Sequence, residues 1–125
     1  MDEPIRILII DDEWLVRWAL ATMLTHRGCV VVEREEANSG AQALTDSSDV
    51  FDVVLLDYKL PDTHGLNLLA TLKRLAPTSS VMMMSAHMSQ DEVEEALRLG
   101  ASAFVPKPFD LDAVWGLIVN ARSPQ

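Results

Sequence analysis

Short apolar runs alternate with longer amphipathic stretches along this chain. The runs at 52–56 (DVVLL) and 81–84 (VMMM) show no regular alternation with polar positions. Such runs are typical of strands buried on both faces, as in a parallel sheet that is covered by helices. The pattern predicts five strands, at residues 5–10, 30–35, 52–56, 81–84 and 103–105.

Capping residues divide the intervening stretches into helices. Ser39 is followed three positions later by Gln42, and Ser89 is followed at the same spacing by Glu92. This is the spacing of a capping box, in which two side chains satisfy backbone amides at a helix start. We therefore expect Ser39 and Ser89 to begin the second and fourth helices. Gly100 predicts the end of the fourth helix, because glycine readily adopts a left-handed conformation there.

The other three helices are predicted from periodicity and turn residues. The first helix covers about residues 14–26. The third begins near Gly65 and ends before Pro77, and the fifth is capped by Asp110. The expected buried stripe of the first helix consists of Val16, Leu20, Met23 and Leu24.

Five strand–helix units with short connections predict a doubly wound α/β fold. Right-handed crossovers place helices on both faces of a five-stranded parallel sheet. The chain has 125 residues, which is a usual size for one domain. We expect that domain to span residues 1–122, followed by a short tail at 123–125.

Composition and charge narrow the range of functions. Hydrophobic residues make up 49% of the chain, which argues against disorder. The net charge of −9 argues against direct nucleic-acid binding, since phosphate backbones require clustered Lys and Arg. The single cysteine, Cys29, cannot form an internal disulfide, and no zinc-like Cys/His spacing is present. The N-terminal apolar run is too short for a signal peptide or a membrane span, so we expect a cytoplasmic domain without a membrane partner.

In doubly wound sheets, ligands bind beyond the carboxyl ends of the strands. The residues expected there are Asp11 and Asp12 after the first strand, Asp57 after the third, Ser85 and Ala86 after the fourth, and Lys107 after the fifth. The second strand delivers no comparable group. We therefore expect these side chains to lie close together at one edge of the sheet.

Three converging carboxylates repel one another strongly. At an effective dielectric constant of about 20, two such charges about 4 Å apart cost roughly 4 kcal/mol. A divalent cation removes this cost, and hard oxygen ligands select Mg²⁺, with Mn²⁺ as an alternative. The ammonium of Lys107 and the hydroxyl of Ser85 suit a phosphoryl group bound at the same place. Each residue alone also has a plain structural interpretation, such as a helix cap or a surface lysine, but four strand ends with complementary groups favour a metal and phosphoryl site.

Four separated motifs follow one another along nearly the whole chain: ILIIDDE, LLDYKLPDTHGL, MMMSAH and GASAFVPKPF. Together they resemble a response-regulator receiver domain of bacterial two-component signalling. The resemblance implies a flavodoxin-like strand order, 2-1-3-4-5, with five helices around the sheet. It also implies a signalling domain rather than an enzyme, one that assists its own phosphorylation and dephosphorylation.

The resemblance assigns the acidic residues to a phosphoryl-acceptor and metal site. Asp57 matches the phosphoacceptor, whose carboxylate takes a phosphoryl group from a histidine kinase or a phosphotransfer protein. Asp12 matches a direct ligand of Mg²⁺, and Asp11 matches an acid that acts on the metal through water. Asp57 and the backbone carbonyl of Lys59 complete the metal set.

The resemblance also implies a switch. Ser85 matches the hydroxyl that moves onto the phosphoryl group, with Ala86 beside it, and Phe104 matches an aromatic residue that turns inward. Lys107 matches the lysine that pairs with the phosphoryl oxygens, and Pro108 matches the proline after it. The surface expected to change is formed by the fourth helix, the fifth strand and the fifth helix.

Three further positions carry expectations from the family. Lys59 and His87 stand two residues past Asp57 and Ser85, where the family tunes how long the phosphoryl group survives. Trp14 stands where the family often has proline, and we expect its side chain to be partly buried.

Other functions fit less well. A phosphatase of the haloacid dehalogenase kind needs a second aspartate where this chain has Lys59. A flavodoxin-type FMN carrier needs a Ser/Thr/Gly-rich phosphate loop where this chain has DDEW. A pseudo-receiver, which is an interaction module without phosphorylation, stays open as the alternative. The partners expected of a working receiver are a histidine kinase or phosphotransfer protein and an output domain or effector; a homodimer through the fourth and fifth helices also stays open.

Overall fold

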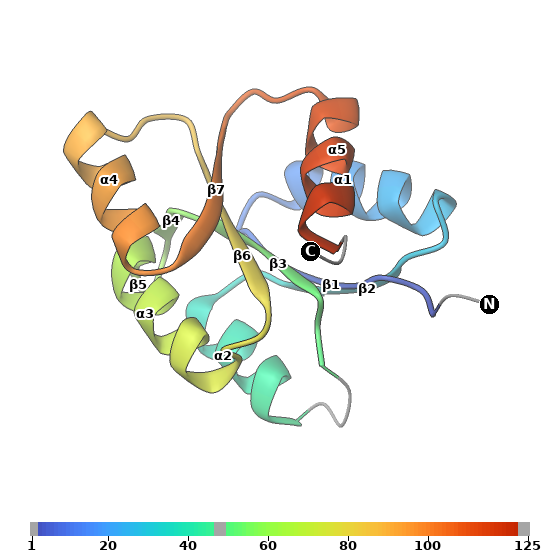
Figure 1. The fold of residues 1–125 in the computed structure, drawn as a ribbon, viewed down its shortest axis with the longest axis horizontal. Coiled ribbons are helices and arrows are strands. Elements are labelled where there is room, and N and C mark those ends of the chain that lie inside the picture. The colour runs from blue at the N-terminus through green and yellow to red at the C-terminus, as the bar shows by residue number, and fades with distance from the viewer. Residues whose placement is uncertain (1–2, 47–49, 123–125) are drawn as a thin grey trace.

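A five-stranded parallel sheet forms the centre of the described chain (Figure 1). The computed structural model describes residues 3–46 and 50–122, apart from the side chains of residues 64 and 122, so the expected tail at 123–125 lies outside the described residues. The strands are β1 (Arg6–Ile10), β2 (Val30–Arg34), β3 (Val53–Asp57), β6 (Ser80–Ser85) and β7 (Ala101–Pro106). Their order is β2-β1-β3-β6-β7, and neighbouring strands are parallel. Counted along the chain, this is the predicted order 2-1-3-4-5, so the predicted fold is confirmed.

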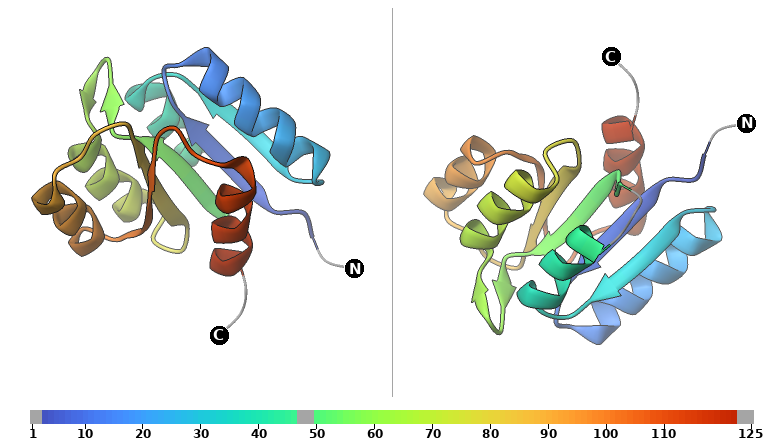
Figure 2. Two further views of the ribbon diagram at one scale, coloured as in Figure 1. Left: turned by 90° about the horizontal axis from the view of Figure 1, so that it is seen from above. Right: turned by 90° about the horizontal axis from the view of Figure 1, so that it is seen from below.

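The described chain has five helices, which cover both faces of the sheet. They are α1 (Trp14–His26), α2 (Ala37–Asp46), α3 (Gly65–Leu75), α4 (Gln90–Arg98) and α5 (Leu111–Arg122). Figure 1 and Figure 2 show α1 and α5 on one face and α2, α3 and α4 on the other. No helix within the described residues is long and apolar enough to cross a membrane.

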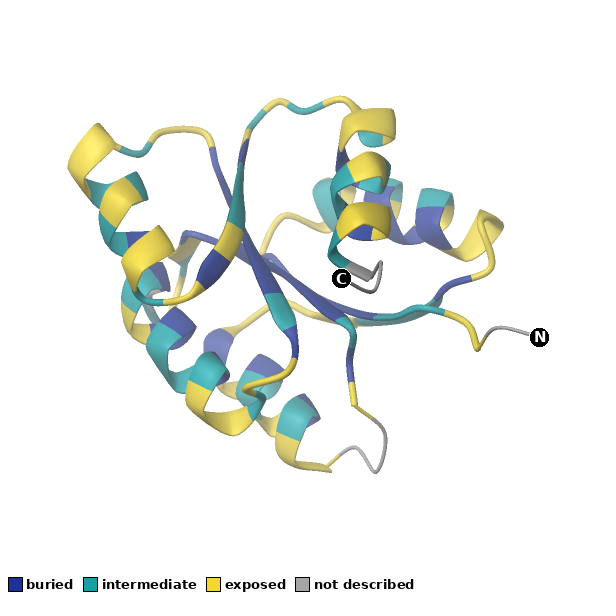
Figure 3. Cartoon of the chain, in the orientation of Figure 1, coloured by how far each residue is buried: buried dark blue, intermediate teal, exposed yellow. Residues whose placement is uncertain are grey.

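Apolar residues of each central strand pack against both helix layers. Ile7 and Ile9 of β1 belong to the cluster under α1 and α5. Leu8 and Ile10 belong to the cluster under α2, α3 and α4. Figure 3 shows these strands as the buried centre of the fold. Since burial of one such side chain stabilises a fold by about 1.5–3 kcal/mol, consecutive apolar positions are favoured here.

The first helix presents its predicted stripe to the sheet. Leu20 and Leu24 are fully shielded, and Val16 and Met23 pack at the margin of the same cluster. The expectation for Trp14 is wrong, because its side chain is 66% exposed. The helical twist of about 100° per residue turns position 14 well away from the buried face.

The start of α2 differs from the sequence prediction. Ser39 is not the cap: the helix begins at Ala37, and the Ser39 hydroxyl donates to the carbonyl oxygen of Glu36 at 3.1 Å. The carboxylate of Asp62 accepts from the amides of Ala37 at 2.9 Å and Asn38 at 3.0 Å instead. These bonds, that from Ala37 foremost, lower the pKa of Asp62. The prediction fails because a cap can come from a distant loop, which no local spacing reveals.

The other predicted helix ends are confirmed. The Ser89 side chain accepts from the amide of Glu92 at 3.1 Å, and the Glu92 carboxylate accepts from the amide of Ser89 at 2.9 Å. Gly100 follows α4 with φ of +114°, a conformation that favours glycine. At the start of α5, the Asp110 carboxylate accepts from the amide of Asp112 at 2.9 Å.

A short hairpin that the sequence did not predict follows β3. Its strands, β4 (Lys59–Leu60) and β5 (Thr63–His64), pair antiparallel. The amide of Gly65 donates to the carbonyl oxygen of Tyr58 at 2.9 Å. A Cβ at position 65 would lie 2.6 Å from that oxygen, so only glycine fits. The hairpin therefore starts from a fixed point beside the carboxyl end of β3.

Candidate functional site

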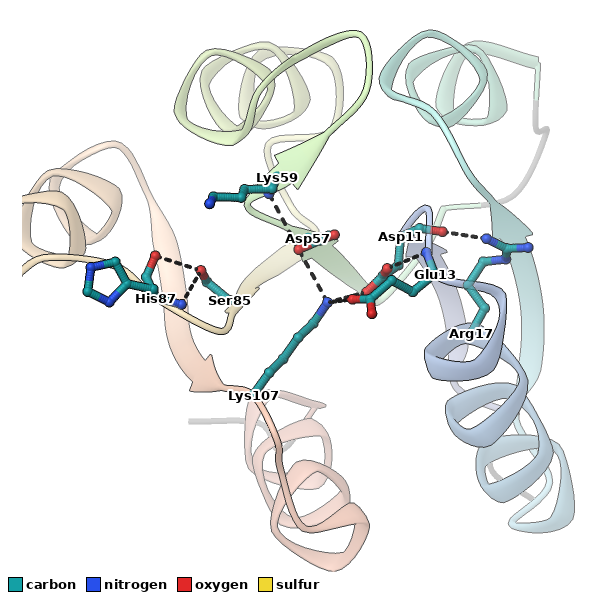
Figure 4. Close-up of polar contacts among 8 residues, drawn as sticks. All are labelled: Asp11, Glu13, Arg17, Asp57, Lys59, Ser85, His87 and Lys107. Carbon is teal, nitrogen blue, oxygen red and sulfur yellow. Dashed lines mark hydrogen bonds and ion pairs between the residues drawn. The ribbon is translucent and has the colours of Figure 1, made fainter.

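The carboxyl ends of β1, β3, β6 and β7 meet at one edge of the sheet. There they bring Asp11, Asp57, Ser85 and Lys107 around a common centre (Figure 4). A cavity of about 260 Å³ at this edge is lined by Asp12, Glu13, Asp57, Lys59, Ser85, Ala86, His87 and Lys107. The arrangement follows from the topology, since parallel strands present all their carboxyl ends on the same side.

Three carboxylates at this edge form a cluster that could hold a metal ion. One oxygen from each of Asp11, Asp12 and Asp57 lies within 4.8 Å of the other two. Asp11 and Asp57 are buried, whereas Asp12 is exposed to the cavity side. The donors are all hard carboxylate oxygens, which suit Mg²⁺ rather than zinc. The residues present therefore fit the cation that the acidic spacing predicted.

The ammonium group of Lys107 contacts two carboxylates of this cluster and a third carboxylate, that of Glu13. Its Nζ lies 2.8 Å from Asp11 Oδ2, 2.9 Å from Glu13 Oε1 and 3.3 Å from Asp57 Oδ1 (Figure 4). Burial alone would lower the pKa of Lys107, but the hydrogen bonds to Asp11 and Glu13 outweigh it and raise that pKa. Lys107 is therefore charged at any physiological pH. No role was predicted for Glu13 from the sequence, although its position directly after Asp12 could have indicated that it belongs to the same acidic loop.

The surroundings of Asp57 disfavour the ionised form of its carboxyl group. Burial, followed by the charge of Asp11, raises the pKa of Asp57 to about 7. Lys107 and the amide of Lys59, which donates to Asp57 Oδ1 at 3.4 Å, act in the opposite direction. A second cation beside Asp57 would favour its ionised form further.

Asp11 is held at every polar atom. Its amide donates to the carbonyl oxygen of Arg34 at 3.1 Å, which extends the β1–β2 ladder by one bond. Its carbonyl oxygen accepts from Arg17 at 2.6 Å, and its Oδ1 accepts from the amide of Glu13 at 2.9 Å. Its Oδ2 accepts from Lys107. Arg17 had no predicted role, and its position on α1 alone did not indicate one.

Ser85 lies at the cavity but bonds to the loop after β6. Its hydroxyl donates to the carbonyl oxygen of His87 at 3.0 Å and accepts from the amide of His87 at 3.0 Å (Figure 4). The side chain of His87 is exposed, as are those of Lys59 and Ala86 at the same cavity. Their predicted roles in phosphoryl binding and lifetime stay predictions.

Phe104 and Pro108 do not line this cavity. Phe104 lies in β7, partly buried against the cluster under α2, α3 and α4. Pro108 is exposed and follows Lys107 through a cis peptide bond. Pro108 lines a neighbouring groove of about 530 Å³, which Ala86 and Lys107 also border.

Tyr58, directly after Asp57, connects the site to α4. Its hydroxyl donates to the carboxylate of Glu92, which also belongs to the capping box of α4. This bond, together with burial, raises the pKa of Tyr58 to about 12, and it lowers the pKa of Glu92. The sequence did not predict this contact, because its partners are 34 positions apart.

Known proteins are similar to this chain in sequence and in fold. The response regulator receiver domain family matches residues 7–118. The DNA-binding transcriptional regulator NtrC of Proteus hauseri is 37% identical over 115 residues, which are 92% of this chain and 24% of that protein. The chemotaxis protein CheY of Bacillus subtilis is 34% identical over 110 residues, which are 87% of this chain and 90% of that protein.

A solved structure agrees with these relatives. The CheY-like receiver domain protein of Methanospirillum hungatei JF-1 superposes with a TM-score of 0.88 at 27% identity, covering 94% of this chain and 93% of that one. The chain spans about a quarter of the length of the NtrC relatives that it matches. Because the family covers most of the chain and CheY matches along nearly its whole length, the chain belongs to the response-regulator receiver domain family.

Proposed function

We propose that this chain is a Mg²⁺-dependent phosphoacceptor switch that takes a phosphoryl group on Asp57 from a histidine kinase or a phosphotransfer protein. The observation that carries the proposal is the setting of Asp57. Its buried carboxylate faces the ammonium of Lys107 at 3.3 Å and lies within 4.8 Å of oxygens of Asp11 and Asp12. Membership in the receiver family supports the same conclusion.

Asp57 acts as the nucleophile. One of its carboxylate oxygens attacks the phosphorus of a phosphohistidine, so that an O–P bond forms while the N–P bond breaks. The imidazole leaves with the electron pair of the broken bond and takes up a proton. The reaction needs Asp57 in its ionised form, and its pKa of about 7 leaves part of it protonated near neutral pH when only Lys107 is present.

Positive charge at the site favours the ionised form of Asp57 and offsets the negative charge of the phosphoryl group. Asp12, Asp57 and the carbonyl of Lys59, with Asp11 acting through water, would hold Mg²⁺ (or Mn²⁺), which would supply charge that offsets the phosphoryl oxygens. Lys107 neutralises the same oxygens from its fixed position at the end of β7.

Ser85 and Phe104 transmit the phosphorylation of Asp57 to the surface of the domain. Ser85 exchanges its bonds to the backbone of His87 for a bond to the phosphoryl group. Phe104, which is only partly buried, then packs further inward. The resulting population shift alters the surface of α4, β7 and α5, which controls an output domain or a separate effector. A homodimer through α4 and α5 would use the same surface.

The domain also assists the gain and loss of its phosphoryl group. Lys59, in β4, and His87, in the loop after β6, flank the cavity beside Asp57 and Ser85 respectively. From there they can hinder or admit an attacking water molecule, and so set the lifetime of the phosphorylated state.

Intact mass tests the proposal directly. Wild type, Asp57→Asn and Asp112→Asn are incubated with a small acyl phosphate, with and without Mg²⁺. Asp112→Asn is the matched control, because that side chain is 84% exposed and lies on α5. We expect one base-labile phosphoryl group on wild type and the control, only with Mg²⁺, and none on Asp57→Asn. Labelling of Asp57→Asn at the wild-type rate would refute the assignment, and no labelling of wild type would favour the pseudo-receiver.

A further inference from the structure

We infer that Arg17 is a positioning residue that holds the acidic loop between β1 and α1 in its metal-binding arrangement by tying it to the end of β2. The inference rests on the proposed metal-dependent function and adds a residue to it. Arg17 itself does not line the metal cluster or its cavity.

The guanidinium of Arg17 contacts three groups from two segments. Its Nη1 donates to the carbonyl oxygen of Asp11 at 2.6 Å (Figure 4). Its Nε lies 3.5 Å from Glu33 Oε1, and its Nη2 lies 3.9 Å from Glu35 Oε2. The side chain of Arg17 is only 15% exposed, whereas those of its partners Glu33 and Glu35 are 43% and 67% exposed. The bond to the buried Asp11 is therefore the best shielded of the three contacts. The end of β2, which delivers no group to the cavity, therefore acts on the site through Arg17.

The bond to Asp11 fixes the peptide from which both metal-binding acids extend. The amide of Asp11 is the last group of the β1–β2 ladder, since it donates to Arg34. Its carbonyl oxygen lies beyond the end of β1 and receives its donor from Arg17. Rotation of the peptide between Asp11 and Asp12 would break this short bond and would change the direction in which the chain leaves β1 at Asp12, whose carboxylate belongs to the metal cluster.

The geometry calls for arginine rather than for positive charge alone. The planar guanidinium presents donors in several fixed directions, and here they reach one carbonyl oxygen and two carboxylates. A lysine ammonium at the end of a flexible chain cannot hold the same three acceptors at once. The charge of Arg17 by itself would disfavour a cation at the nearby acidic cluster. Positioning and charge therefore predict opposite effects on Mg²⁺ affinity.

Because the two effects are opposite, the direction in which Mg²⁺ affinity changes on replacing Arg17 distinguishes positioning from charge. Mg²⁺ titrations by calorimetry compare wild type, Arg17→Met and Arg27→Met. Arg27 is the matched control, because it is also an arginine in an ion pair, with Asp112 at 3.1 Å. It lies directly after α1, at the end of the helix that is far from the acidic loop. We expect Arg17→Met to weaken Mg²⁺ binding by about tenfold, as is typical for loss of a group that orients metal ligands. Arg27→Met should leave the affinity within about twofold of wild type.

The competing outcomes overturn the inference. Mg²⁺ binding by Arg17→Met that is equal to or tighter than that of wild type would mean that the residue contributes only its charge. Arg17→Lys keeps the charge and provides a second, milder variant in case Arg17→Met does not fold. We expect Arg17→Lys to bind Mg²⁺ more weakly than wild type; wild-type affinity would overturn the inference as well.

A measurement without metal separates positioning from general destabilisation. Hydrogen exchange of the Glu13 amide, which is bonded to Asp11 Oδ1, reports on the loop itself. We expect faster exchange there in Arg17→Met than in Arg27→Met, with amides of β6 exchanging equally in both. Equal exchange at Glu13 would contradict the inference. If wild type binds Mg²⁺ but takes up no phosphoryl group, the proposed function fails while the Arg17 comparison still stands.

Discussion

At the scale of single residues, the proposed phosphoryl group would give Lys107 more acceptors than its ammonium group can satisfy. It already contacts Asp11, Glu13 and Asp57 at 2.8, 2.9 and 3.3 Å. The side chain of Glu13 is 60% exposed, whereas those of Asp11 and Asp57 are almost fully buried. The bond to Glu13 is the one most easily given up, because water can replace the lysine there.

The ionisation of Asp57 makes stability depend on pH when no divalent cation is present. Its pKa is raised from 3.8 to about 7 by burial and by Asp11. Between these values the folded chain keeps a proton that the unfolded chain has lost, so stability falls as pH rises through this range. We expect Asp57→Asn to be more stable than wild type by on the order of 2 kcal/mol at about pH 8, with the difference fading toward about pH 4.

Urea unfolding in a chelating buffer at several pH values measures this difference. Asp112→Asn again serves as control, since the same change on the exposed surface of α5 should alter stability only slightly at every pH. A wild-type chain as stable as Asp57→Asn at about pH 8 would show that Lys107 already compensates Asp57 in full.

At the scale of elements, a carboxylate joins the hairpin of β4 and β5 to the second helix. Asp62 lies in the turn of this hairpin and caps α2 through the amides of Ala37 and Asn38. The hairpin begins at Lys59, whose carbonyl is the proposed metal ligand. The hairpin, whose Lys59 lines the cavity, is thus bound to α2, which does not line it.

Two substitutions distinguish this cap from the one that the sequence predicted. We expect Asp62→Ala to lower the free energy of unfolding by about 1–2 kcal/mol, because it leaves two helix amides without an acceptor and removes a favourable charge at the helix start. Ser39→Ala should cost only a few tenths of a kcal/mol, since its hydroxyl donates to the carbonyl oxygen of Glu36 and caps no helix amide. Urea unfolding measures both, and a larger loss for Ser39→Ala would contradict the observed cap.

At the scale of the whole molecule, we expect metal binding and folding to be coupled. The acidic cluster gathers Asp11 and Asp12 from the loop after β1 and Asp57 from the end of β3, so the unfolded chain has no equivalent site. We expect Mg²⁺ at about a hundred times its dissociation constant to stabilise the fold by about 2.7 kcal/mol. Denaturant unfolding with and without Mg²⁺, at constant ionic strength, measures the gain.

Asp12→Asn is the informative variant for this coupling. Asp12 is exposed, so its replacement should leave the metal-free fold nearly unchanged while removing one ligand oxygen. We expect the stabilisation by Mg²⁺ to fall markedly in this variant. The same gain in Asp12→Asn as in wild type would place the bound cation elsewhere on this acidic chain.

The sequence by itself determined the sheet and the main groups at its edge. Consecutive apolar residues such as Leu55 and Leu56 predict a strand covered on both faces, and that pattern is local. Once five parallel strands follow, the positions of Asp11, Asp57, Ser85 and Lys107 at one edge follow as well, because parallel strands share a direction. No knowledge of side-chain packing was needed for this part.

Only the tertiary structure decided how these groups are held. The cap of α2 comes from Asp62, 25 positions away from Ala37, and the hydroxyl of Tyr58 reaches Glu92 on another element. Arg17 could have faced solvent like the neighbouring Trp18, but the path of β2 brings Glu33 within its reach. Periodicity records which face of an element is buried, whereas a long-range hydrogen bond depends on where two distant segments meet. For that reason, the strand ends could be predicted from the chain, and their supporting contacts could not.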